Sequence, residues 1–142
     1  MEKRIKDKIS EIKSYLEELQ EIVPDTLKIY DEDFKSKAAC ERYFEKIVES
    51  AIDLAILVIK RDGLNMPKDD ESAFRTLFEG GIITEELCKK LIDAKGMRNF
   101  IAHRYGEVDD SLVFISLKEE LEKDIQTFLE GINEGERKDE KN

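Results

Sequence analysis

Residues 34–63 of this chain read FKSKAACERYFEKIVESAIDLAILVIKRDG. Between Ile47 and Ile59 this stretch is apolar on nearly every side when it is wound as an α-helix. Such a helix needs cover all round, which either the other helices of a bundle or a second subunit can supply. We therefore predict a long helix from about Asp33 to Arg61, near the centre of an α-helical protein.

Two further helices are expected on either side of this one. An N-terminal helix should end near Val23, because Pro24 disfavours helical geometry in the residue before it. Its apolar residues fall at steps of four and three, at Ile5, Ile9, Ile12, Leu16, Leu19 and Ile22. A shorter helix through ESAFRTLFEG, residues 71–80, can take Asp69 or Asp70 as its N-cap.

The C-terminal half is expected to hold two more long helices. Thr84 is followed by two glutamates, which is the signature of an N-cap, so a helix should run from there to about Tyr105 and end at Gly106. Another should begin between Asp109 and Ser111, and its inward positions are Leu117, Leu121, Ile125, Phe128 and Ile132. The fold class predicted is all-α, an up-and-down bundle of four long helices plus one short helix.

The C-terminal segment NEGERKDEKN differs in composition from the rest of the chain. It has too little apolar surface to hold it against a core. A length of 142 residues suits one domain. We predict a single helical domain over residues 1–133 and a charged, disordered tail over residues 134–142.

The charge of the chain restricts the partners it can bind. Its formal net charge is -10, which argues against broad, sequence-independent binding to nucleic acid. Residues 87–106 nevertheless carry a local charge of +4, so the remainder carries -14. A small basic site in an acidic body suits a local phosphate ligand. A merely solvated helix face is the alternative explanation.

Compartment and redox state are also constrained. No apolar run approaches the roughly 20 residues that span a bilayer, and the N-terminus lacks the apolar region of a signal peptide. A cytoplasmic protein is therefore expected, with no membrane partner. Cys40 and Cys88 lack the close spacing of metal or redox sites, so two buried, reduced thiols are expected and no metal site is predicted.

The segment RNFIAHRYG, residues 98–106, holds the only histidine of the chain. On a helical projection Arg98 and Tyr105 lie on the apolar side of their helix, whereas Asn99 and His103 lie on another side, roughly 100–140° away. Asn99 and His103 are four residues apart, which lets the amide hold the imidazole in one tautomer. The two sides can converge where the helix ends, or across a twofold axis that brings two subunits around one cleft.

These groups permit phosphodiester cleavage without a metal. An imidazole can remove the proton of an RNA 2′-hydroxyl or protonate the departing 5′-oxygen near neutral pH. The guanidinium of Arg98 can bind two oxygens of the phosphorus centre as negative charge builds there. One histidine per chain cannot readily make both proton transfers, but two histidines of a symmetric dimer can.

A purely structural interpretation is also open. Arg98 can pair with an acid such as Glu41 or Glu45 inside the bundle, since a guanidinium on an apolar stripe must find a carboxylate, a phosphate or water. The histidine and the arginine after it can serve only the negative end of the helix. Tyr105 can be a core residue with its hydroxyl at the rim.

The spacing of Arg98, His103 and Tyr105 matches the Arg-x4-His-x-Tyr signature of HEPN domains. The segment GMRNFIAHRYGEVD, followed by an acidic amphipathic helix, resembles the HepT-like ribonuclease toxins of that superfamily. The similarity in layout extends over almost the whole chain, including CERYFEKIVESAIDLA and the short helix before the motif.

This resemblance implies a homodimer that cleaves RNA in a cleft at the subunit interface. Arg98 would bind phosphate and stabilise the transition state, His103 would be the acid/base, and Asn99 and Arg104 would support them, with no metal or other cofactor required. The resemblance also implies a type VII toxin–antitoxin system whose antitoxin, an MNT-type nucleotidyltransferase, transfers AMP from ATP to Tyr105. The alternative within the family is a non-catalytic module that binds a nucleotide or the nucleotidyltransferase.

Overall fold

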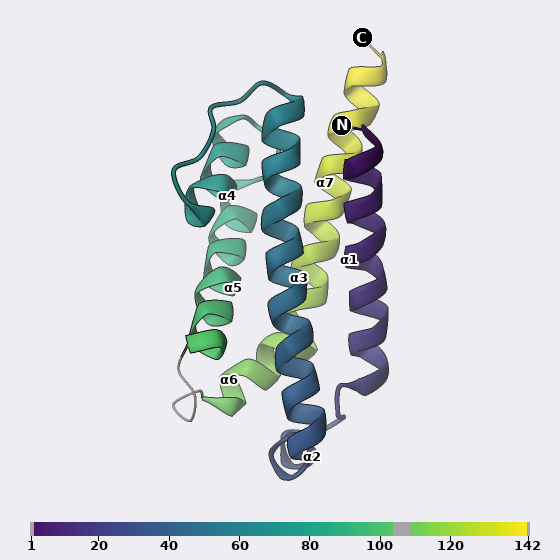
Figure 1. The fold of residues 1–142 in the computed structure, drawn as a ribbon, viewed down its shortest axis with the longest axis vertical. Coiled ribbons are helices and arrows are strands. Elements are labelled where there is room, and N and C mark those ends of the chain that lie inside the picture. Colours follow the sequence, from purple (N-terminus) through teal and green to yellow (C-terminus); the bar gives the residue numbers. More distant parts are fainter. Residues whose placement is uncertain (1, 104–108, 142) are drawn as a thin grey trace.

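A computed structural model describes residues 2–103 and 109–141, with side chains described for 2–103 and 109–133. The described chain is helical, and Figure 1 shows long helices packed side by side with both ends of the chain at the same end of the bundle. The elements in chain order are α1 (Glu2–Ile22), α2 (Leu27–Glu32), α3 (Phe34–Arg61), α4 (Asp70–Glu79), α5 (Glu85–His103), α6 (Asp110–Ile115), a π-helical segment η1 (Ser116–Glu120) and α7 (Leu121–Lys141).

Helix α3 is the centre of the bundle, as its sequence predicts. It packs against α1, α2, α4 and α5. Its apolar residues are buried on several sides: Cys40, Phe44, Ile47, Val48, Ala51, Ile52, Leu54, Ala55, Val58 and Ile59. The predicted inward residues of α1 and α7 are buried as well, apart from Ile22, which is partly buried. The all-α fold class is therefore confirmed, and the dimer stays a prediction.

Side-chain caps begin the helices where the sequence indicates. Asp33 accepts hydrogen bonds from two backbone N–H groups at the start of α3, and Asp69 accepts one at the start of α4. Thr84 accepts the N–H of Leu87, 3.1 Å away, at the start of α5. Each cap satisfies a donor that has no partner within the helix, which fixes where that helix starts.

The last predicted helix begins where expected, with Asp110 as its first residue, but it is not α-helical throughout, because the π-helical segment η1 interrupts it. The backbone widens between α6 and α7, where the N–H of Leu121 donates to the carbonyl of Ser116, five residues back. Val113, Leu117 and Leu121 are all buried although they follow one another at steps of four. Eight residues of an ordinary α-helix turn a side chain by about 80°, so the wider turn is what keeps both ends of this series on the core.

The structure has more short helices than the single one that the sequence predicts. Helix α4 is the predicted short helix, but α2 and α6 form two more. Thr26 caps α2 by accepting the N–H of Ile29. This capping threonine is visible in the sequence, but the prediction of a helix end at Pro24 drew attention away from a new helix so soon after it. At the other end of the chain, the backbone of α7 runs past residue 133 to Lys141, and the division into a domain and a disordered tail stays a prediction.

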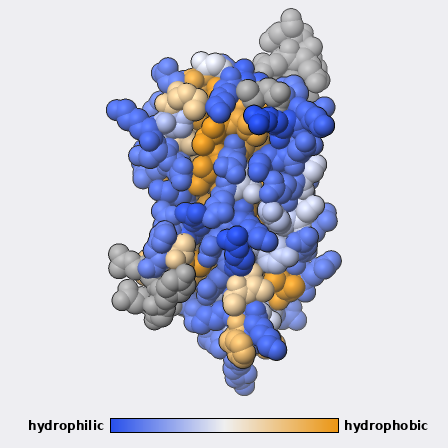
Figure 2. Space-filling view, in the orientation of Figure 1, coloured by the Kyte–Doolittle hydropathy of each residue, from blue (hydrophilic) through white to orange (hydrophobic). Residues whose placement is uncertain are grey.

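The surface is mostly hydrophilic. Figure 2 shows hydrophobic residues over the upper half of α3 and at the lower end of the bundle, with mostly hydrophilic residues elsewhere on that face. Large exposed apolar residues of the described chain include Leu27, Ile29, Phe34, Leu112 and Ile115. None of the described helices combines the length and apolar content that crossing a bilayer requires.

Tyr30 of α2 is a core residue that carries a buried polar group. Its side chain is fully buried against Phe114 of α6, with the ring centroids 5.4 Å apart. Burial raises the pKa of the Tyr30 hydroxyl, and within the described part of the chain that hydroxyl has no hydrogen-bond partner. Packing of the ring, rather than the hydroxyl, therefore joins α2 to α6.

We expect Tyr30→Phe to raise the free energy of unfolding by about 1 kcal/mol, because it removes a buried donor that lacks an acceptor and keeps the ring. Urea titration followed by circular dichroism measures the change. Tyr43→Phe is the matched control, since the Tyr43 hydroxyl donates to Glu18 and its loss brings no such gain. A less stable Tyr30→Phe protein would contradict this account of the core.

Candidate active site

Arg98 is fixed by two oxygen atoms from different parts of the fold. Its Nη2 donates to Glu49 Oε1 of α3 at 2.6 Å, and its Nη1 donates to Asn99 Oδ1 at 2.8 Å. Its Nε is buried and has no hydrogen-bond partner among the residues that the structure describes. A guanidinium carries five N–H donors, so one N–H on each η nitrogen is left for a further acceptor.

The partner of Arg98 differs from the residues that the sequence suggests. Neither Glu41 nor Glu45 contacts it, and the carboxylate lies one helical turn further along α3, at Glu49. Glu45 instead pairs with Arg42. Which acid of α3 pairs with Arg98 depends on how far α5 is displaced along α3. That displacement is set by the packing of the two helices and cannot be deduced from the helical spacing within either one.

His103 is the last residue of α5 and its side chain is exposed. The amide oxygen of Asn99 accepts from Arg98 Nη1, and the predicted contact of the same amide with His103 stays a prediction. Asn99 therefore helps to orient the guanidinium of Arg98. Arg104, Tyr105 and the predicted helix end at Gly106 lie outside the described residues.

Comparison with known proteins bears directly on this segment. The family model described as Ribonuclease HepT-like matches residues 12–132, which include Glu49 and the whole Arg98–Tyr105 motif. The chain belongs to this family. The resemblance stated from the sequence is thus confirmed.

Individual HepT-like relatives match over most of their length. A chain from Archaeoglobus fulgidus is 36% identical over 108 residues, which are 74% of this chain and 80% of that one. A protein of Aphanizomenon flos-aquae named tRNA nuclease HepT is 26% identical, over 80% of this chain and 77% of its own. The solved structure of a tri-AMPylated HEPN toxin of Shewanella oneidensis in complex with MNT antitoxin is similar with a TM-score of 0.84 at 26% identity, covering 91% and 96% of the two chains.

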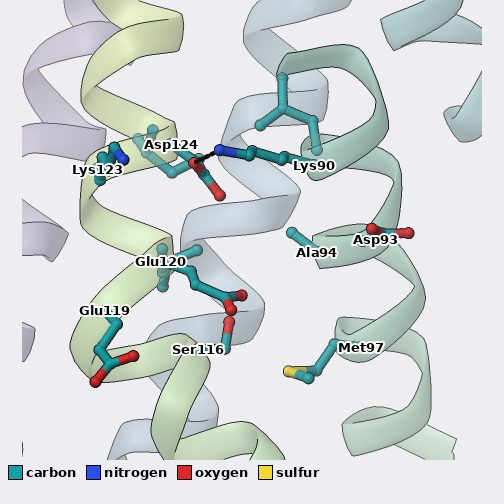
Figure 3. Close-up of a pocket in the computed structure, with 12 residues that line it drawn as sticks. Lys90, Asp93, Ala94, Met97, Ser116, Glu119, Glu120, Lys123 and Asp124 are labelled. Atoms are coloured by element: carbon teal, nitrogen blue, oxygen red, sulfur yellow. Dashed lines mark ion pairs between the residues drawn. The ribbon is translucent and has the colours of Figure 1, made fainter. Parts of the chain in front are cut away.

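A hollow between α5 and the η1–α7 junction of this HepT-like chain has a volume of about 310 Å³ (Figure 3). Carboxylates outnumber amines around it, with Asp93, Glu119, Glu120 and Asp124 against Lys90 and Lys123. Burial raises the pKa of the Asp124 carboxyl, whose nearest cation is Lys90, 3.9 Å away. Phosphate would be repelled from such a surface, so this hollow is no candidate for the phosphate site.

The predicted basic patch over residues 87–106 is narrower than its count of charges indicates. Lys89 pairs with Glu85 at 3.5 Å, and Lys90 pairs with Glu86 at 3.4 Å. Both glutamates precede the basic window in sequence but lie one turn away on the same helix. Arg98 is paired as well, with Glu49, so acidic partners offset much of the positive charge that the sequence places on α5.

The two cysteines are free and buried, as predicted. Burial raises the pKa of the Cys40 thiol to about 11 and that of Cys88 above its ordinary value. A thiol that stays protonated is a poor nucleophile and a poor metal ligand. These residues act as small apolar side chains in the core of the chain.

Glu41 lies beside the α6 end of the site rather than against Arg98. Burial raises the pKa of its carboxyl, the charge of Lys37 opposes this shift, and Asp110 adds to it. Lys37 itself forms an ion pair with Asp110, the first residue of α6. The Lys37–Asp110 ion pair thus joins the start of α6 to α3. It lies beside the carboxyl of Glu41, whose ionised form is disfavoured by burial.

We expect Glu41→Gln to stabilise the protein near pH 7.5 by about 0.5–1 kcal/mol, with a gain that disappears near pH 4. A carboxyl whose pKa is raised by folding stabilises the native state only while protonated, and that stability is lost as the pH rises through its folded pKa. Thermal unfolding at the two pH values measures this difference. Glu17→Gln, on the exposed side of α1, is the matched control.

Proposed function

We propose that this chain is an endoribonuclease toxin of a type VII toxin–antitoxin pair, acting in the cytoplasm without a metal ion. The observation that carries the proposal is the state of Arg98. Two fixed acceptors hold its guanidinium and leave N–H donors on both η nitrogens, five positions before an exposed histidine at the end of the same helix. That arrangement suits an oxyanion at phosphorus, in a chain whose relative bears the name tRNA nuclease HepT.

In the proposed reaction one imidazole of His103 takes the proton of the RNA 2′-hydroxyl. The 2′-oxygen then attacks phosphorus, the bond to the 5′-oxygen breaks, and a second imidazole protonates that oxygen. Arg98 binds the phosphoryl oxygens on which charge accumulates. The products are a 2′,3′-cyclic phosphate and a free 5′-hydroxyl, so no water enters the first step.

A homodimer supplies the second imidazole in this proposal, because each chain has one histidine. Support comes from exposed apolar side chains within the motif and in the helix α6 that follows it. Phe100 of α5 is 41% exposed, and Leu112 and Ile115 of α6 are 56% and 43% exposed. Clustered apolar surface of this kind is typical of protein interfaces.

The purified protein should cleave RNA in EDTA, and His103→Ala and Arg98→Ala should each lower the rate at least about 100-fold. Gel analysis of a labelled RNA measures the rate, and circular dichroism checks the fold. Arg75→Ala is the matched control, since Arg75 is an exposed arginine of α4 that pairs with Glu71. Cleavage by His103→Ala at the wild-type rate would overturn the assignment and leave the non-catalytic binding module as the function.

Leu112→Glu should convert the dimer to monomers and lower cleavage together with it, because a charge would be buried at the interface. Light scattering after size exclusion measures the mass. Met66→Glu is the control: Met66 is 57% exposed in the α3–α4 connection, at the opposite end of the bundle. Loss of the dimer with full cleavage would show that one chain suffices.

We further propose that an MNT-type nucleotidyltransferase silences the toxin by transferring AMP from ATP to Tyr105. Support comes from the similar toxin of Shewanella oneidensis, which is AMPylated and bound to MNT antitoxin. On this chain Tyr105 follows Arg98 by seven residues, two helical turns, so an added phosphodiester would lie near the guanidinium if the helix continued. The new negative charge would occupy the N–H groups that RNA phosphate requires.

Incubation with the cognate nucleotidyltransferase and ATP should add mass in units of AMP and abolish RNA cleavage. Intact mass spectrometry measures the addition, and Tyr105→Phe should abolish it. Tyr15→Phe, a partly exposed tyrosine of α1, should still gain AMP. An unchanged gain in Tyr105→Phe would place the modification on another residue.

A further inference from the structure

The contact between α3 and the proposed catalytic arginine assigns a role to a residue that lies outside the motif. Glu49 is separated from Arg98 by 49 positions in sequence, yet its Oε1 lies 2.6 Å from Arg98 Nη2. The Arg98 side chain is 23% exposed and that of Glu49 is 40% exposed. A charge-assisted hydrogen bond this short, in a partly buried setting, restrains both groups more than an exposed ion pair would.

We propose that Glu49 is a positioning residue for RNA cleavage, which orients the guanidinium of Arg98 toward the scissile phosphate. The inference rests on the proposed ribonuclease function. Glu49 holds Nη2 and Asn99 holds Nη1, so the guanidinium plane is fixed at two of its nitrogens. With Nε buried, an incoming phosphate oxygen is met by the remaining N–H groups on Nη1 and Nη2.

Orientation matters because arginine has a long side chain with much rotational freedom. The planar fork of donors binds two phosphate oxygens well only when it is turned toward them. A guanidinium held before substrate arrives loses less freedom in the transition state, where charge on the phosphoryl oxygens is greatest. Glu49 should therefore act on kcat more than on KM.

The same contact has two competing explanations. In one, Glu49 only neutralises an arginine that α5 directs toward α3, and its removal affects stability alone. In the other, the carboxylate competes with RNA phosphate for the same N–H groups, and its removal should accelerate cleavage. Kinetics and a direct observation of the guanidinium separate these two from positioning.

Steady-state cleavage of one RNA should be compared among wild type, Glu49→Ala, Glu49→Gln and Glu45→Ala. We expect Glu49→Ala to lower kcat about tenfold or more with a change in KM below about threefold. Glu49→Gln, which keeps an oxygen acceptor, should recover part of that loss and guards against misfolding of the alanine variant. Glu45→Ala removes an acid one turn earlier on α3 that pairs with Arg42, so it should cleave like wild type.

Nitrogen NMR of the arginine side chains tests the orientation without relying on cleavage. In the wild type, restrained rotation should give separate signals for Arg98 Nη1 and Nη2, which Arg98→Lys identifies by removing them. Glu49→Ala should merge these signals, and Glu45→Ala should leave them apart.

The outcomes separate the failure of this proposal from that of the function. Unchanged Nη signals, unchanged kcat or faster cleavage in Glu49→Ala would each overturn the positioning role, whereas His103→Ala still reports on the nuclease itself. If the wild type did not cleave RNA, both the ribonuclease function and the positioning role of Glu49 would be wrong.

Discussion

A guanidinium keeps its charge at every pH a protein meets, and Arg98 lies on the side of α5 that packs toward α3. The carboxylate of Glu49 and the amide oxygen of Asn99 accept hydrogen bonds from this charged group. An unpaired charge in the same place would carry a penalty of several kcal/mol. The relative placement of α3 and α5 is thereby tied to the proposed chemistry, because the helix that fills the centre of the core also binds the arginine to which that proposal assigns a role.

This dual role of α3 explains why its sequence changes character along its length. Its second half, from Ile47 onward, is buried on most sides and forms the centre of the bundle. Acidic residues follow one another at steps of four along α3, at Glu41, Glu45 and Glu49, and the first and last of them face other elements. Glu41 lies near the start of α6, and Glu49 meets α5. One helix therefore supplies both the rigid support and the carboxylate.

The segment after the motif is held from two directions. Asp109 caps α6, and Asp110 pairs with Lys37 of α3. Beyond α6, the π-helical segment lets the chain turn into α7 without losing the burial of Leu117 and Leu121. Because wide turns of this kind weaken the regular hydrogen-bond ladder, they persist where packing on both sides outweighs the loss. Here the core contacts of α6 and α7 provide that packing.

Local sequence determined the helices, since apolar spacing and capping residues act within a few positions of one another. The starts of α3, α4 and α5 follow from Asp33, Asp69 and Thr84 for this reason. The same local rules overlooked α2 and the π-helical segment, because a short helix after a proline and a widened turn leave weak periodic signals.

The site divides in the same way. Sequence alone marked Arg98 and His103 by type and spacing, and it indicated that the arginine needed an anionic partner. Only the tertiary structure decided that the partner is Glu49 and that the amide oxygen of Asn99 accepts from the arginine. Those choices depend on the displacement of α5 along α3, which is set by the packing of many buried side chains and is not contained in either helix by itself.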